Sequence, residues 1–225
     1  MPINHLILLL YLLTFPATAA EVALDIGHSR NNPGVVSAGG IPEWELNRQL
    51  ALAVAARLQR IGISYRLIGA DGDMEVLTDR TALAKKDTLF ISLHHDSVQP
   101  EWLAHVDRYS GYSLFVSRQN RKLHGSLACA KQIGDRLLAT SFHPSRYHAT
   151  AVKGENRPFA DQSRGIHYYD GLAVLRTAHQ PAVLIEAGVA VNPQDEISVT
   201  GTEGRGRVSE AIAQAIAGCL KTLRK

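Results

Sequence analysis

Short, mainly apolar runs alternate along the chain with segments in which apolar residues recur every three or four positions. The short runs predict strands at Val22–Ile26, Ser64–Ile68, Thr88–Leu93, Tyr112–Val116 and Ala182–Ile185. The periodic segments predict helices at Pro42–Gly62, Thr78–Lys86, Arg121–Leu138 and Val208–Leu223. Strands that alternate with helices predict an α/β fold, with a mostly parallel or mixed sheet covered by helices on both faces.

One long segment, Ala139–Gln180, has no strong periodicity. Loops of that length inside compact domains usually have a function, so we expect this one to contribute to a site. No internal repeat, low-complexity tract or interdomain linker interrupts the pattern after residue 20. Residues 21–225 are therefore expected to form a single domain.

The first twenty residues differ from the rest. Leu6–Leu13 is apolar, and Pro16 and the small residues ATAA follow it. This pattern predicts a secretory signal peptide over residues 1–20, cleaved near Ala20, with an apolar run too short to span a membrane after maturation. The opening MPINH has no Lys or Arg, so a buried strand or an uncleaved anchor is the alternative.

Composition narrows the function classes. With 225 residues and 45% hydrophobic content the chain is ordinary and globular. The formal net charge is only +3, and the cations are scattered, which argues against a nucleic-acid-binding surface. Cys129 and Cys219 lie in helical patterns, where they could bridge two helices or stay separate as small buried residues. Neither cysteine has the spacing of a metal ligand.

Candidate chemistry lies where predicted strands end. His28 follows the first strand, His94 and His95 follow the third, and Glu186 follows the strand at Ala182–Ile185. Strand ends of an α/β sheet form the crevice where ligands bind. Neighbouring residues of a strand point to opposite faces, so only one of His94 and His95 should face a site there.

Two glutamates compete for a place beside these histidines. On a helical wheel, Leu50, Val54 and Ile61 lie within roughly 20° of Glu43, whereas Glu45 points to the polar side. Glu43 is therefore expected to face the sheet and Glu45 the solvent. A buried carboxylate needs a partner, which a metal ion or a salt bridge would supply. Two imidazoles and one carboxylate leave an open position on zinc, the arrangement of catalytic zinc sites.

Taken together, the sequence segments around these residues resemble the zinc-dependent N-acetylmuramoyl-L-alanine amidases of the amidase 3 type, which are bacterial cell-wall hydrolases. The family pattern is D-x-G-H after a strand, a Gly-rich loop, a glutamate that opens a long helix, S-[IL]-H, and a late V-L-[IV]-E-x-G. The matching segments here are Asp25–His28, Gly34–Gly40, Glu43, Ser92–His94 and Val183–Gly188. The resemblance extends from about Val22 to the C-terminus. It departs at Ser29-Arg30, where the family has Gly-Gly, and at His95-Asp96, near a common asparagine.

The resemblance implies one zinc ion per chain, bound by His28, Glu43 and His94, with Glu186 as catalytic acid and base. The implied substrate is peptidoglycan, cleaved between N-acetylmuramic acid and L-alanine by an exported, periplasmic or wall-associated catalytic domain over residues 21–225. Need for a protein activator is not readable from the sequence. Asp25, Asp96 and His95 could orient the ligands or serve as caps and surface charges, and Arg164 could meet a stem-peptide carboxylate.

Two other functions stay open. A zinc carboxypeptidase or other peptidase on a related scaffold would use similar ligands. A non-catalytic peptidoglycan-binding domain is the other alternative, although retention of Glu186 argues against it, because a binding protein needs no general base.

Overall fold

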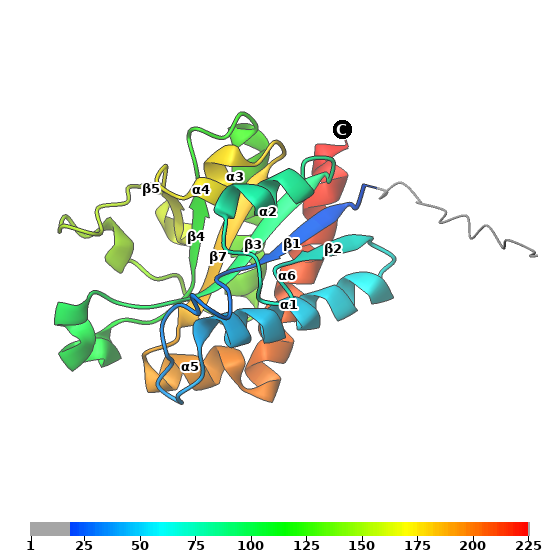
Figure 1. The fold of residues 1–225 in the computed structure, drawn as a ribbon. Coiled ribbons are helices and arrows are strands. Elements are labelled where there is room, and N and C mark those ends of the chain that lie inside the picture. Colours follow the sequence, from blue (N-terminus) through cyan, green and yellow to red (C-terminus); the bar gives the residue numbers. More distant parts are fainter. Residues whose placement is uncertain (1–18, 225) are drawn as a thin grey trace, which may run out of the picture.

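A seven-stranded mixed sheet forms the centre of the molecule (Figure 1). The structure is a computed structural model that describes residues 19–224. The strands are β1 (Val22–Ile26), β2 (Tyr65–Ile68), β3 (Leu89–Asp96), β4 (Ser113–Val116), β5 (Phe159–Asp161), β6 (Ile166–Tyr168) and β7 (Ala182–Val189). Their order across the sheet is β2-β1-β3-β7-β4-β6-β5.

The strands that carry the candidate site are parallel neighbours. β1 pairs with β2 and with β3, and β3 pairs with β7, all in parallel. β4 runs antiparallel to β7 and parallel to β6, and β5 is antiparallel to β6. Because β1, β3 and β7 are parallel and adjacent, their carboxyl ends meet at one edge of the sheet.

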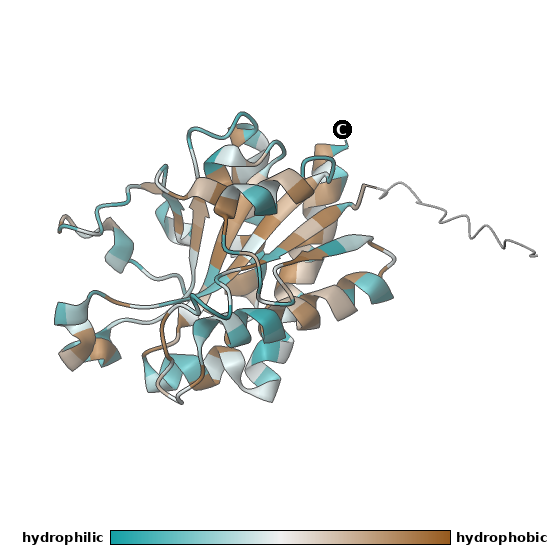
Figure 2. Ribbon diagram, in the orientation of Figure 1, coloured by the Kyte–Doolittle hydropathy of each residue, from teal (hydrophilic) through white to brown (hydrophobic). Residues whose placement is uncertain are grey.

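Helices cover both faces of the sheet. The helices of the described chain are α1 (Glu43–Arg60), α2 (Leu77–Leu83), α3 (Leu123–Ala139), α4 (Ala173–Thr177), α5 (Pro193–Thr200) and α6 (Thr202–Leu223), with 3-10 turns η1 (Pro100–Arg108), η2 (Tyr147–Ala149) and η3 (Gln162–Arg164). Apolar side chains of α1, α3 and α6 share the larger core with one face, and α4 packs on the other. Figure 2 shows the apolar residues concentrated on the strands.

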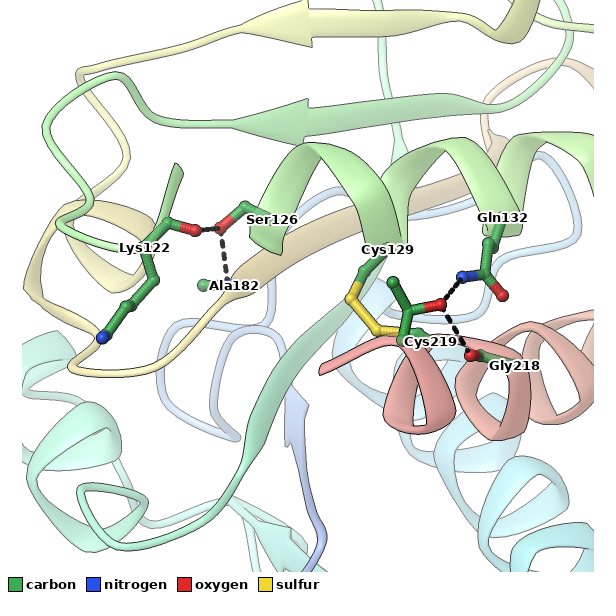
Figure 3. The surroundings of a disulfide bond; sticks show 8 residues. Lys122, Ser126, Cys129, Gln132, Ala182, Gly218 and Cys219 are labelled. Carbon is green, nitrogen blue, oxygen red and sulfur yellow. Dashed lines mark hydrogen bonds between the residues drawn. A yellow bond between two sulfur atoms is a disulfide. The ribbon is translucent and has the colours of Figure 1, made fainter. Parts of the chain in front are cut away.

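A disulfide joins Cys129 of α3 to Cys219 of α6, which settles the alternative left open by the sequence (Figure 3). The two residues are 90 positions apart in the chain, and both are buried in the larger core. The neighbouring Gln132 donates a hydrogen bond to Thr222, so the same two helices are also linked at their surface.

Most predicted elements are present, with ends shifted by up to six residues. The largest shift is at α6, which begins at Thr202 instead of Val208. α1 begins at Glu43 rather than Pro42 and ends before Gly62, which has a φ of +74° that favours glycine. β3 and β7 are longer than predicted and include His94 and Glu186, so these residues lie within strands instead of following them. The sequence patterns did not predict η1, α5, or the elements between α3 and β7.

The predicted signal peptide covers residues 1–20 and lies almost wholly outside the described residues 19–224. Among those described residues, none of the helices combines the length and the apolar character that crossing a bilayer requires.

Candidate active site

His28 lies just after β1, at the sheet edge where β1, β3 and β7 end. Its backbone has a φ of +70°, a left-handed conformation that is uncommon for residues other than glycine. In this conformation Nε2 of the imidazole lies 3.0 Å from Oε2 of Glu43. The bend after β1 therefore directs the first predicted ligand toward the second.

Glu43 is the first residue of α1 and is 5% exposed, on the helix face that carries Leu50 and Val54. Its Oε1 lies 3.0 Å from Nδ1 of His94. Burial alone would raise the pKa of Glu43, but hydrogen bonds and charge from both histidines outweigh it and hold the pKa far below its ordinary value. Glu43 is therefore a carboxylate held between two imidazoles.

The helical-wheel prediction is confirmed for Glu45 and wrong for Ile61. Glu45 points away from the site and is partly exposed, with Gln49 and Arg48 as its partners. Ile61, placed on the buried side by the same argument, lies past the end of α1 and is 52% exposed. The periodicity holds only as far as the helix continues.

The two neighbouring histidines point to opposite faces of β3, as predicted. His94 meets Glu43, whereas the His95 ring is buried on the other side, with its Nδ1 2.8 Å from Oδ1 of Asn47. Burial lowers the pKa of His95 to about 4, so this imidazole is neutral. Asn47 also donates to Oε1 of Glu43, and His95 and Asn47 thus form a second layer behind the carboxylate.

Glycines allow the backbone to approach these side chains closely. A Cβ atom at Gly27 would lie 2.2 Å from the His94 ring. A Cβ at Gly34 would lie 2.3 Å from Oε2 of Glu43 and 2.9 Å from the His28 ring. Side chains at either position would occupy the space that His28, Glu43 and His94 now use.

Glu186 lies on β7, opposite His94 on β3 and Ser113 on β4 in the strand register. Its Oε2 is buried and has no hydrogen-bond partner within residues 19–224. Burial raises the pKa of Glu186 well above its ordinary value, and the charges of Asp96 and Glu43 raise it further. Such a carboxyl group can hold a proton near neutral pH and exchange it with a bound reactant.

A cavity of about 470 Å³ connects these groups. His28, His94 and Glu186 line it at the sheet edge. Its opposite wall is mostly apolar and comes from the segment before α2, from α2 and from the start of α4, through Met74, Leu77, Leu172, Ala173 and Val174. His28, His94 and Glu186 therefore face one space that a substrate can enter, and Glu43 lies between the two imidazoles.

The long segment after α3 contributes a cluster that the sequence did not reveal. Asp96, at the end of β3, accepts hydrogen bonds from the Tyr147 hydroxyl and from Nε2 of His148, the latter at 2.6 Å. The other ring nitrogen of His148 lies 2.8 Å from Glu155, which also pairs with Arg157. The only sequence signal was the expectation that this segment has a function.

Two further residues from the sequence have structural partners. Asp25 pairs with Arg80 and accepts a hydrogen bond from Ser92, and Asp25 and Arg80 both line the cavity. Arg164 is paired with Asp135 and Asp161 and does not line the cavity, so the structure offers no support for its contact with a stem peptide.

The donor set fits a small divalent cation. One ligand atom from each of His28, Glu43 and His94 can be chosen so that all lie within 4.8 Å of one another. Bonds of zinc to nitrogen and oxygen are about 2.0–2.2 Å, and two neutral imidazoles with one carboxylate are a recurrent zinc ligand set. A metal ion bound between the two imidazoles would also supply the partner that the buried Glu43 carboxylate needs.

Comparisons with known proteins agree with this geometry. The sequence profile of the amidase 3 family, described as N-acetylmuramoyl-L-alanine amidase, matches residues 22–218. N-acetylmuramoyl-L-alanine amidase Rv3717 of Mycobacterium tuberculosis is 25% identical over 193 residues, which are 84% of this chain and 73% of that protein.

Solved structures share the fold. The N-acetylmuramyl-L-alanine amidase Ami1 of Mycobacterium smegmatis superposes with a TM-score of 0.72 at 24% identity, covering 89% of this chain and 96% of that one. The CwlD amidase of Clostridioides difficile, in complex with the GerS lipoprotein, has a TM-score of 0.68 at 18% identity, with 90% and 99% covered. With the family profile matched over nearly the whole described domain, the chain belongs to the amidase 3 family of N-acetylmuramoyl-L-alanine amidases, enzymes that act on peptidoglycan.

Proposed function

We propose that the chain hydrolyses the amide between N-acetylmuramic acid and L-alanine of peptidoglycan with one zinc ion held by His28, Glu43 and His94. The observation that carries the proposal is the Glu43 carboxylate, with an imidazole 3.0 Å from each of its oxygens. The two imidazoles line the same cavity as Glu186. Family membership supports the amidase reaction over the peptidase and the non-catalytic binding domain.

When bound there, zinc would make a coordinated water acidic near neutral pH and polarise the amide carbonyl. Glu186 accepts a proton from the attacking water at its free oxygen and donates it to the amine nitrogen of the departing L-alanine. Its raised pKa makes the Glu186 carboxylate a stronger base than an ordinary glutamate, which favours uptake of the proton. Asn47 and His95 hold the Glu43 carboxylate in place during the reaction.

The first test combines metal analysis with digestion of purified peptidoglycan sacculi. We expect about one zinc per chain and a product with a free amino group on L-alanine, lost on chelation and restored by zinc. Release of C-terminal amino acids instead would indicate a carboxypeptidase. Absence of bound zinc after reconstitution would contradict the proposed ligand set.

The second test addresses Glu186. Replacing it by Gln keeps the shape of the side chain but removes proton transfer, so kcat should fall by about 10²–10⁴-fold while zinc content stays unchanged. Glu210→Gln, on the outer surface of α6 where Glu210 pairs with Arg57, is the matched control and should retain activity. Substantial turnover by Glu186→Gln would remove this residue from the mechanism.

We further propose that residues 1–20 are a signal peptide and that the enzyme acts in the periplasm or at the wall. The disulfide between Cys129 and Cys219 supports export, since such bonds persist in oxidising compartments. N-terminal sequencing of the protein from the periplasmic fraction should begin near Glu21. A chain that retains residues 1–20 would contradict cleavage. A protein activator is the other partner that we consider, since the CwlD amidase is similar in fold and forms a complex with the GerS lipoprotein.

A further inference from the structure

In the wall of the cavity, one buried cation contacts the backbone that carries His28. Arg80 belongs to α2 and is 1% exposed, although arginine is rarely buried without several partners. Its Nη1 donates to Oδ1 of Asp25 at 2.8 Å and to the carbonyl of Ile26 at 2.5 Å. Its Nη2 donates to the carbonyls of His28 and Met74. Three of these four acceptors lie at the end of β1.

The contact with His28 bears on the conformation of a candidate ligand. His28 has a φ of +70°, which most side chains adopt only when surrounding contacts hold them there. The hydrogen bond from Arg80 to the His28 carbonyl supplies such a contact, because it fixes the peptide plane that follows the imidazole. If the carbonyl were released, the φ of His28 could relax, and because Cβ moves with φ, the ring would turn away from Glu43.

The same arginine is linked to the strand of the second histidine. Asp25 accepts from Arg80 with one carboxylate oxygen and from the Ser92 hydroxyl with the other, at 2.7 Å. Ser92 lies on β3, two residues before His94 and on the same face. Arg80 thus contacts the end of β1 directly and β3 through Asp25.

We propose that Arg80 is a positioning residue of the metal site, whose guanidinium holds His28 and, through Asp25 and Ser92, the β3 strand of His94 in the arrangement that binds zinc. A guanidinium is suited to this because its planar fork donates in several fixed directions at once, which the single ammonium of lysine cannot do. Arg80 does not touch the reacting atoms in this assignment. The inference rests on the proposed zinc site.

The test measures zinc affinity of the apo protein by competition with a chromophoric chelator, together with the melting temperature of the apo form. We expect Arg80→Met and Arg80→Lys to bind zinc at least tenfold more weakly, in the range typical for residues that orient metal ligands. Arg80→Lys keeps a positive charge beside Asp25. If Arg80→Met does not fold, the zinc affinity of Arg80→Lys is the result that tests the proposal.

Arg66→Met is the control for general destabilisation. Arg66 forms a comparable ion pair with the buried Asp87, whose carboxylate also accepts from the backbone of Ala20, before β1 and thus at the opposite end of the strand from His28. Arg66→Met should melt at a lower temperature than the wild type. Its zinc affinity should stay within about twofold of the wild-type value, well short of the tenfold loss typical for residues that orient metal ligands.

Two results would overturn the assignment: wild-type zinc affinity in a folded Arg80→Lys variant, or an equal loss of affinity in Arg66→Met. Failure of the wild-type chain to bind zinc is a different outcome, since it contradicts the proposed function before Arg80 is tested.

Discussion

Gly34 determines how closely the loop before α1 approaches the candidate ligands. Its φ is +77°, and an added Cβ would lie 2.3 Å from Oε2 of Glu43. Replacing Gly34 by Ala should displace the Glu43 carboxylate and the His28 ring. Zinc affinity, measured by chelator competition, should then fall at least tenfold, which is the usual effect of losing the orientation of a metal ligand. Backbone strain adds a folding cost of about 1–2 kcal/mol.

Gly40 offers a matched control for that strain. It has a φ of +81°, but an added Cβ would meet nothing within 4 Å. Gly40→Ala should therefore cost a similar free energy of unfolding and leave zinc affinity unchanged. Equal zinc affinities in the two variants would show that the close approach at Gly34 does not shape the site.

Residue-scale reasoning from the sequence reached the side chains whose position follows from a strand end or a helical face. His28, His94 and Glu43 were identified in this way, and the structure brings them together. Arg80 and His148 were missed because their partners, Asp25 and Asp96, are more than 50 positions away in the chain. Arg80 had one faint signal, since it shares a helix face with the buried Ala84. Such pairings depend on tertiary contacts that no local pattern encodes.

At the scale of elements, the segment after α3 shows where periodicity fails. β5, β6 and η2 have three residues each, and α4 has five. None is long enough to complete the repeat that identifies a helix or a strand. The lengths of β3 and β7 were underestimated for another reason: their ends carry the polar residues His94 and Glu186, which interrupt the apolar pattern.

The same segment predicts how stability depends on pH. His148 lies between Asp96 and Glu155, with Arg157 adjacent. Burial opposes its charge, but the two carboxylates outweigh this and raise the pKa of His148 to about 9. Because the folded pKa exceeds the unfolded value of about 6.5, protonation stabilises the fold by about 3 kcal/mol. This contribution is complete below about pH 6.5 and is lost as the pH rises through about 9.

Urea unfolding between pH 6 and pH 10 measures this dependence. His148→Gln should be less stable than the wild type at pH 6, with the difference shrinking toward pH 10. His179→Gln removes an exposed histidine and should keep the wild-type profile. A His148→Gln profile parallel to that of the wild type would show that the imidazole is not charged in the folded protein.

At the scale of the whole molecule, the disulfide joins helices that are far apart in the chain. Cys129 lies within α3 and Cys219 within α6, so the bond closes a loop that runs from α3 to α6, with a sequence separation of 90 residues. Closing such a loop restricts the unfolded chain, which corresponds to roughly 4–5 kcal/mol by chain entropy and to about 2–4 kcal/mol in typical measurements. Reduction should therefore lower the urea midpoint markedly. Zinc affinity should be kept under conditions where the reduced chain is folded, because neither α3 nor α6 supplies a candidate ligand.

A double variant, Cys129→Ala with Cys219→Ala, separates the bond from other effects of the reductant. It should have a lower urea midpoint without reductant, and adding reductant should change it no further. Since both cysteines are buried, part of its loss comes from packing, so the reductant-sensitive difference in the wild type measures the bond itself. An unchanged wild-type midpoint on complete reduction would show that the core alone holds α3 against α6. The disulfide would then give no stability reason for the enzyme to fold in an oxidising compartment.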